Sequence, residues 1–227
     1  MARARGVRRI SEWIAVFAMA SVTSVWAQAG LQERNINGEL LVAARNGSEA
    51  AVSALIDQGA SPNSRNRLGE TPLNIAAREG RLGMAKLLVD RGADFNLKNL
   101  AGVTPLMSAA FGGHVDIVRL LVAHRADVTP VDRVKKTAAI YAAGNGHTDC
   151  VAAILDAGVD VNARYANDVT LLMWAAAYGH EGTVKLLLVR GADPRARDNR
   201  GKSALDIARE EGQAAAAALL AAAGAAE

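Results

Sequence analysis

Residues 98–122 read KNLAGVTPLMSAAFGGHVDIVRLLV, and this stretch decides the fold because its pattern returns every 33 residues. Thr104-Pro105-Leu106 repeats Thr71-Pro72-Leu73, and the same step reaches Thr137, Thr170 and Ser203. Alanine follows each start by five positions, at Ala43, Ala76, Ala109, Ala142, Ala175 and Ala208. Glycine follows by nine, at Gly47, Gly80, Gly113, Gly146, Gly179 and Gly212. Six repeats are therefore predicted: 38–70, 71–103, 104–136, 137–169, 170–202 and 203–227.

Each repeat contains the signals of two short helices. The threonine is a helix N-cap, and proline suits the first turn because its missing N–H has no partner there anyway. The small alanine lets neighbouring helices approach closely, and the glycine ends the first helix in a left-handed conformation. The second helix has apolar residues at helical spacing, as in Ile117, Val118 and Leu121. Arg125 replaces the glycine that ends this helix elsewhere, so a positive φ is expected to cost about 1–2 kcal/mol there.

The repeat resembles the ankyrin repeat. Residues 98–106 and 113–122 match its signature almost letter for letter, as does Arg190-Gly191-Ala192-Asp193-Pro194, and the resemblance covers 38–227. The signature usually has histidine after the leucine, whereas this chain has Asn74, Met107, Ile140, Met173 and Asp206. The resemblance implies an all-α repeat solenoid, an ankyrin stack of helix pairs with projecting β-turn fingers. It further implies a concave surface that works through protein–protein contacts.

The first 27 residues have the order of a secretory signal peptide. Four arginines precede the apolar run from Trp13 to Ala27, which ends in small residues, and cleavage is expected after Ala27 or Ala29. The run is shorter than the roughly 20 residues of a spanning helix. An uncleaved anchor and an amphipathic transit peptide are the alternatives, and the export route stays open. Residues 28–37 form a short polar lead-in.

Charge argues against a nucleic-acid partner. Residues 1–27 hold four of the 26 Lys and Arg and one of the 23 Asp and Glu, so 22 of each sign remain. The mature chain is formally neutral, which disfavours a broad phosphate-binding surface.

The sequence contains no arrangement typical of an enzyme or of a metal or cofactor site. His114, His147 and His180 share one repeat position, where the ankyrin signature uses histidine to hydrogen-bond the inter-helix loop. Asp94, Asp127, Asp160 and Asp193 form a second ladder of turn residues. Cys150 has the core position of Ile117 and Met84, so no cofactor, metal or catalytic residue is expected.

Aromatic residues gather in the middle repeats, on the first-helix positions expected to face the groove. They are Phe111, Tyr141, Trp174 and Tyr178, with Tyr165 in the finger before Trp174. Because Trp and Tyr dominate interface hot spots, this cluster is the predicted centre of a partner site. Packing of Tyr141 and Trp174 against neighbouring repeats is the alternative.

The finger between the third and fourth repeats is irregular and basic, with Arg133, Lys135 and Lys136. It suits an acidic partner, and a solvated, slightly degenerate turn is the alternative.

The sequence therefore predicts an exported, monomeric, non-enzymatic protein-binding module, periplasmic or secreted, with no membrane contact after cleavage. A stabiliser of a periplasmic enzyme, an inhibitor or immunity-type protein, and a secreted factor acting on another cell all remain open. A structural spacer without a discrete partner is the alternative from another class.

Overall fold

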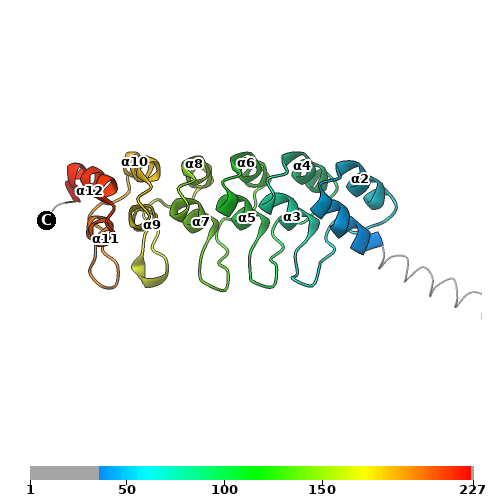
Figure 1. The fold of residues 1–227 in the computed structure, drawn as a ribbon, viewed down its shortest axis with the longest axis horizontal. Helices are drawn as coiled ribbons and strands as arrows, with labels where there is room; N and C mark the ends of the chain where they lie inside the picture. Colours follow the sequence, from blue (N-terminus) through cyan, green and yellow to red (C-terminus); the bar gives the residue numbers. More distant parts are fainter. Residues whose placement is uncertain (1–35, 226–227) are drawn as a thin grey trace, which may run out of the picture.

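The computed structural model describes residues 36–225, which form one row of helix pairs joined by projecting fingers (Figure 1). The first described helix runs over residues 36–46, so helical structure already includes the end of the expected lead-in. The expected signal peptide lies outside the described residues. The other helices are α2 (Glu49–Asp57), α3 (Pro72–Arg78), α4 (Leu82–Asp90), α5 (Pro105–Gly112), α6 (Val115–Ala123), α7 (Ala138–Gly144), α8 (Thr148–Asp156), η1 (Ala166–Asp168), α9 (Leu171–Ala177), α10 (Glu181–Val189), α11 (Ala204–Glu210), α12 (Ala214–Leu220) and η2 (Ala221–Ala225). The predicted all-α repeat solenoid is confirmed.

Side-chain caps fix where the first helix of each repeat begins. The hydroxyl groups of Thr71, Thr104, Thr137, Thr170 and Ser203 each accept a hydrogen bond from the backbone N–H three residues later. Asn74 and Asp206 return the bond to the backbone N–H of their caps, so two of the departures from the family signature are reciprocal capping residues.

The helices lie in two layers around one continuous core. Helices α3, α5, α7, α9 and α11 pack side by side, and α2, α4, α6, α8, α10 and α12 form the second layer (Figure 1). The repeated alanines lie in the core, and five of them, Ala76, Ala109, Ala142, Ala175 and Ala208, have no exposed surface. Cys150 is 1% exposed, so its predicted place in the core is confirmed.

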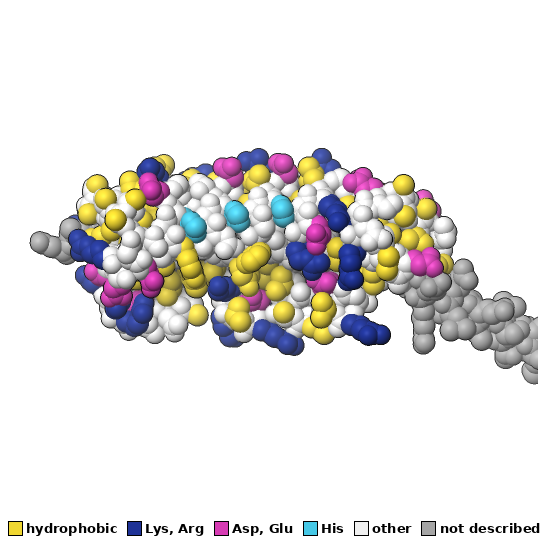
Figure 2. Space-filling view, viewed as in Figure 1, with side chains coloured by type: hydrophobic (Ala, Val, Ile, Leu, Met, Phe, Trp, Pro, Cys, Tyr) yellow, Lys and Arg dark blue, Asp and Glu magenta, His cyan; other side chains and the backbone are white. Residues whose placement is uncertain are grey.

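Histidines join successive repeats. The Nε2 atoms of His114, His147 and His180 lie 3.1, 3.0 and 2.9 Å from the carbonyl oxygens of Arg78, Phe111 and Gly144 in the preceding repeat. The bond therefore crosses the repeat boundary at the end of a first helix. Hydrophobic side chains lie below the row of histidines, and Lys and Arg gather near the fingertips (Figure 2).

The backbone at Arg125 has φ 60°, the left-handed conformation that glycine supplies at the other second-helix ends. The positive φ expected at this position is therefore confirmed. It lies at the start of the segment that leads into the irregular finger.

Candidate functional site

The predicted aromatic residues form a continuous cluster in the groove, the face made by the first helices and the inner side of the fingers. The rings of Phe111 and Tyr141 meet edge to face, with centroids 5.5 Å apart and an interplanar angle of 85°. The rings of Trp174 and Tyr178 stack at 6.2 Å and 9°. Phe111 is 57% and Tyr178 55% exposed, whereas Tyr141 and Trp174 are half-buried. We call Phe111, Tyr141, Trp174 and Tyr178 the groove cluster.

Helix geometry and one glycine allow these rings to meet. Trp174 and Tyr178 are four residues apart at the end of α9, so they lie on one face. Gly144, one repeat earlier, lies beneath them, and a Cβ there would be 3.6 Å from Trp174 Cε3. The groove cluster and Lys136 line a cleft of about 370 Å³.

Lys136 connects the cluster to its neighbouring finger. Its Nζ lies 4.8 Å from the ring centroid of Trp174 and 5.5 Å from that of Tyr141. The sequence placed Lys136 at the fingertip with Arg133 and Lys135, but its side chain turns back over the two rings. Such cation–π contacts contribute about 0.5–1 kcal/mol each at exposed sites.

The same repeat position carries an ion pair at both ends of the groove. Glu70 pairs with Arg78, and Lys202 pairs with Glu210, and each pair joins the last residue of a fingertip to the helix that follows it. Eight residues after Lys136, where the partner would stand in the following helix, the chain has Gly144, which offers no carboxylate. At this repeat position the two ends of the groove therefore have ion pairs, whereas in the middle of the groove a lysine lies over aromatic rings.

The buried carboxylate of Asp132 links Tyr141 to the 132–136 finger through hydrogen bonds. Asp132 is 6% exposed, and its Oδ1 accepts hydrogen bonds from the backbone N–H groups of Val134 and Lys136, both at 2.9 Å. The Tyr141 hydroxyl donates to Asp132 Oδ2. Burial, reinforced by this carboxylate, raises the pKa of Tyr141 to about 12. The phenol therefore remains a hydrogen-bond donor at neutral pH.

The five fingers are joined by a ladder of backbone hydrogen bonds that is interrupted once. The fingertips are residues 66–70, 99–103, 132–136, 165–169 and 198–202. The bonds run from Leu100 N to Leu68 O, from Arg133 N to Ala101 O and from Asn199 N to Asn167 O, at 2.9, 3.0 and 3.0 Å. Periodicity places the fourth bond between Ala166 N and Val134 O. Within residues 36–225 neither group has a hydrogen-bond partner.

Tyr165 explains the interruption. The other fingers have Asn66, Asn99, Asp132 or Asp198 at its position, and each of these side chains accepts two backbone N–H bonds that shape the fingertip. A phenol ring cannot fold back to do this. The 165–169 finger instead forms the short helix η1, with positive φ at both Asn167 and Asp168.

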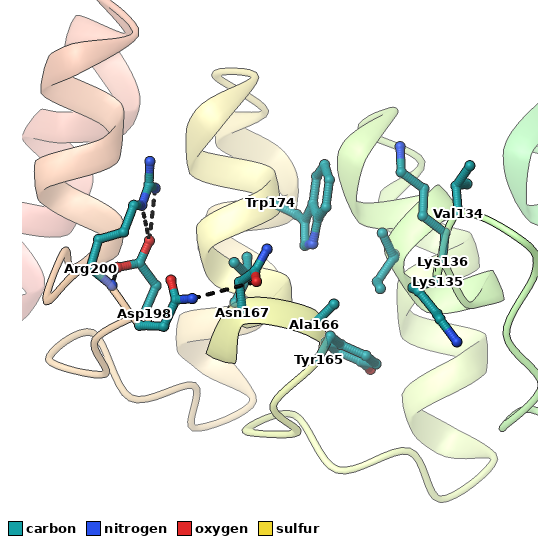
Figure 3. Close-up of a pocket in the computed structure, with 12 residues that line it drawn as sticks. Val134, Lys135, Lys136, Tyr165, Ala166, Asn167, Trp174, Asp198 and Arg200 are labelled. Carbon is teal, nitrogen blue, oxygen red and sulfur yellow. Dashed lines mark hydrogen bonds and ion pairs between the residues drawn. The ribbon is translucent and has the colours of Figure 1, made fainter.

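The interruption opens a space between the 132–136 and 165–169 fingers, which we call the interfinger cleft. Two connected hollows of about 580 and 630 Å³ share Lys135, Tyr165 and Ala166 as lining residues. Tyr165 points from its own finger toward Lys135, and Trp174 and Lys136 lie above it (Figure 3). Burial raises the pKa of Tyr165. The cleft continues into the groove because Lys136 and Trp174 line both spaces.

Comparison with protein families decides the classification. Models described as ankyrin repeats in three copies match residues 25–99 and 93–165, and a model of many ankyrin copies matches 154–208. These matches span most of the chain. The chain belongs to the ankyrin-repeat family.

A solved structure agrees with this assignment. The crystal structure of EF0377, an ankyrin-repeat protein, is similar to this chain with a TM-score of 0.74 and 33% identity. The similarity covers 81% of this chain and 96% of that one. Comparison with the curated proteins gives no match. Ankyrin-repeat proteins are typically non-enzymatic modules that mediate protein–protein interaction.

The aspartate ladder, which the prediction rejected as catalytic, has a structural role in this ankyrin stack. The Oδ1 atoms of Asp94, Asp127, Asp160 and Asp193 accept from the backbone N–H two residues later, as turn residues do. Within residues 36–225 no three His, Cys, Asp or Glu side chains are arranged to hold a metal ion. None of the described helices is both long and apolar enough to span a bilayer.

The structure also identifies candidate site residues that the sequence analysis missed. Val134, Ala166 and Asn167 border the interfinger cleft, as do Asp198 and Arg200 of the next finger. A signal was present in the sequence: Tyr165 is the one tyrosine at a repeat position otherwise held by Asn or Asp. The consequence for the neighbouring finger became visible only in three dimensions.

Cys150 is expected to be inert toward thiol reagents in the folded protein. Burial, reinforced by Asp149, raises the pKa of its thiol to about 11, and a thiol reacts as its thiolate. Iodoacetamide labelling near about pH 8 should be at least 100-fold slower in buffer than in urea, where the pKa returns toward about 8.5. Mass spectrometry of the labelled protein measures both rates. Comparable rates would mean that this part of α8 opens readily.

Proposed function

We propose that this ankyrin-repeat protein is exported and binds one protein partner through the groove, with the groove cluster at the centre of the interface. One observation carries the proposal: two large aromatic rings, those of Phe111 and Tyr178, are more than half exposed beside the two half-buried rings of Tyr141 and Trp174. Exposed aromatic side chains held by packed neighbours lose little conformational entropy on binding, which is why they dominate interface energetics.

The position of the cluster supports the same function. It lies in the middle repeats, with the ion pairs of Glu70 and Lys202 toward the two ends of the groove. An apolar centre with a polar rim is the usual anatomy of a protein interface. The leader-like residues 1–27 support export, and an exported chain meets its partner in the periplasm or outside the cell.

Loss of the exposed rings is expected to remove binding and preserve the fold. A Phe111→Ala, Tyr178→Ala variant should lose roughly 2–4 kcal/mol of binding free energy because both rings are hot-spot candidates. Its stability should fall by less than about 1 kcal/mol because both rings are largely exposed. The measurement is affinity capture from exported and cytosolic fractions with the mature chain as bait, followed by calorimetric titration of the captured protein.

The control is a Val189→Ala variant. Val189 is 85% exposed at the end of α10, outside the groove. One protein should be captured from the exported fraction by wild type and control, and lost by the aromatic variant. Equal capture by all three baits would contradict a groove interface, and capture of nothing by any bait would favour a structural spacer.

A further inference from the structure

The interfinger cleft has backbone hydrogen-bonding groups without partners. At the other finger junctions the N–H and C=O at these positions bond to each other across 2.9–3.0 Å. At the cleft, Ala166 N–H and Val134 C=O have no such bond within the described chain. One group is a donor and the other an acceptor, and they belong to facing walls. An extended peptide offers both complements along its own backbone.

One wall of the cleft is basic, and the nearby carboxylate of Asp198 is already engaged. Lys135 and Lys136 stand on the 132–136 wall, and Arg200 of the next finger, paired with Asp198, lies beyond the 165–169 finger. Asp198 accepts from the Arg200 guanidinium at 2.7 and 2.9 Å and from the backbone N–H groups of Arg200 and Lys202. These bonds lower the pKa of Asp198 despite the opposing effect of its burial. In place of a carboxylate, Lys136 has aromatic rings as partners.

The floor of the cleft is apolar. Ile140, Val169 and Trp174 line it together with the ring of Tyr165. Successive side chains of an extended peptide point to opposite sides. A peptide that alternates acidic and apolar residues therefore directs its carboxylates to the lysines and its apolar side chains to the floor. The hollow of about 580 Å³ falls within the roughly 300–1,000 Å³ of ligand clefts.

We propose that an extended acidic peptide segment of the partner, with alternating apolar residues, inserts between the 132–136 and 165–169 fingers and replaces their missing backbone bond. This inference rests on the proposed function, because the cleft opens into the groove cluster and the same partner extends from one to the other. The cleft is therefore open because residue 165 is Tyr, whereas the other fingers have Asn or Asp at this repeat position.

The test is selection from a library of random linear dodecapeptides displayed on phage, with the mature chain immobilised. Wild type should enrich peptides in which Asp or Glu alternates with apolar residues. A Lys135→Glu, Lys136→Glu variant should bind an enriched synthetic peptide at least about tenfold more weakly, because two attractive contacts become repulsive. The control is Lys86→Glu, Lys185→Glu, which makes the same charge change on the exposed faces of α4 and α10 and should retain affinity.

A second variant tests the backbone pairing alone. Ala166→Pro removes an N–H that has no partner among residues 36–225, and Tyr165 before it has the extended conformation (φ −103°, ψ −165°) that proline tolerates in its predecessor. Its melting temperature should be unchanged while peptide affinity falls about fivefold, the worth of one hydrogen bond.

The outcomes separate this inference from the proposed function. Peptides without acidic residues, or affinity unchanged in both cleft variants, would overturn the cleft as the peptide site. If those peptides were nonetheless lost in the Phe111→Ala, Tyr178→Ala variant, the groove interface would stand without the cleft. Peptides that bind every variant equally would contradict both.

Discussion

Replacing Gly146 with alanine is expected to lower the free energy of unfolding by about 3 kcal/mol. Gly146 joins α7 to α8 with φ +73°, where an L-residue costs about 1–2 kcal/mol. An added Cβ would also lie 2.6 Å from His180 Nδ1 and 2.8 Å from Cγ of the same ring. The ring cannot easily retreat, because its Nε2 is bonded to Gly144 O at 2.9 Å and its face stacks on Tyr178.

The matched control for this substitution is Gly191→Ala. Gly191 has φ +86°, but an added Cβ would meet nothing within 4 Å. Its substitution should therefore cost only the backbone strain of about 1–2 kcal/mol. Urea unfolding followed by circular dichroism measures both changes. Equal destabilisation of the two variants would show that the His180 ring moves aside freely.

The second large effect is expected at Asp132. Its replacement by alanine leaves the N–H groups of Val134 and Lys136 and the hydroxyl of Tyr141 without an acceptor. At roughly 1 kcal/mol for each lost bond, the variant should be less stable by about 3 kcal/mol. The 132–136 finger should also lose its fixed geometry, so affinity for an acidic peptide should fall although both lysines are present.

Asp132→Asn separates finger geometry from charge. Asn66 and Asn99 accept the same two backbone bonds with an amide oxygen in the preceding fingers. The asparagine variant should therefore lose only about 1 kcal/mol of stability. Urea unfolding and hydrogen exchange of the Val134 and Lys136 amides provide the measurement. Alanine and asparagine variants of equal stability would contradict the role assigned to this carboxylate.

Most of the residues that face the groove could be predicted from the sequence because an ankyrin stack repeats its geometry. The 33-residue step assigns each side chain to a cap, a core position or the groove, and it placed Cys150 in the core. Phe111 and Tyr178 were assigned to the groove for the same reason, and both side chains are more than half exposed. The strain at Arg125 followed from a missing glycine, since left-handed backbone is a local property.

The relations between repeats were not predictable in the same way. The sequence left open whether Tyr141 and Trp174 pack or protrude, and the structure shows that each is partly buried and also borders the groove. Lys136 was grouped with the basic fingertip, but it lies over the rings of Tyr141 and Trp174, which belong to the next two repeats. A side chain as long as lysine can reach several partners, and the one it contacts depends on the distances between neighbouring repeats. A periodic sequence pattern does not give those distances.

The sequence by itself determined the repeat, its caps, its core and the face on which aromatic residues gather, because these depend on hydrogen bonds and spacings within one repeat of 33 residues. Only the tertiary structure decided that the finger ladder breaks between Val134 and Ala166. That break depends on two neighbouring fingers at once. Tyr165 lacks the side-chain acceptor that shapes the other fingertips, so the 165–169 finger changes conformation and the 132–136 finger loses the backbone hydrogen bond expected at Val134 O. Contacts between repeats arise from both partners together, so they appear only when the helices are stacked.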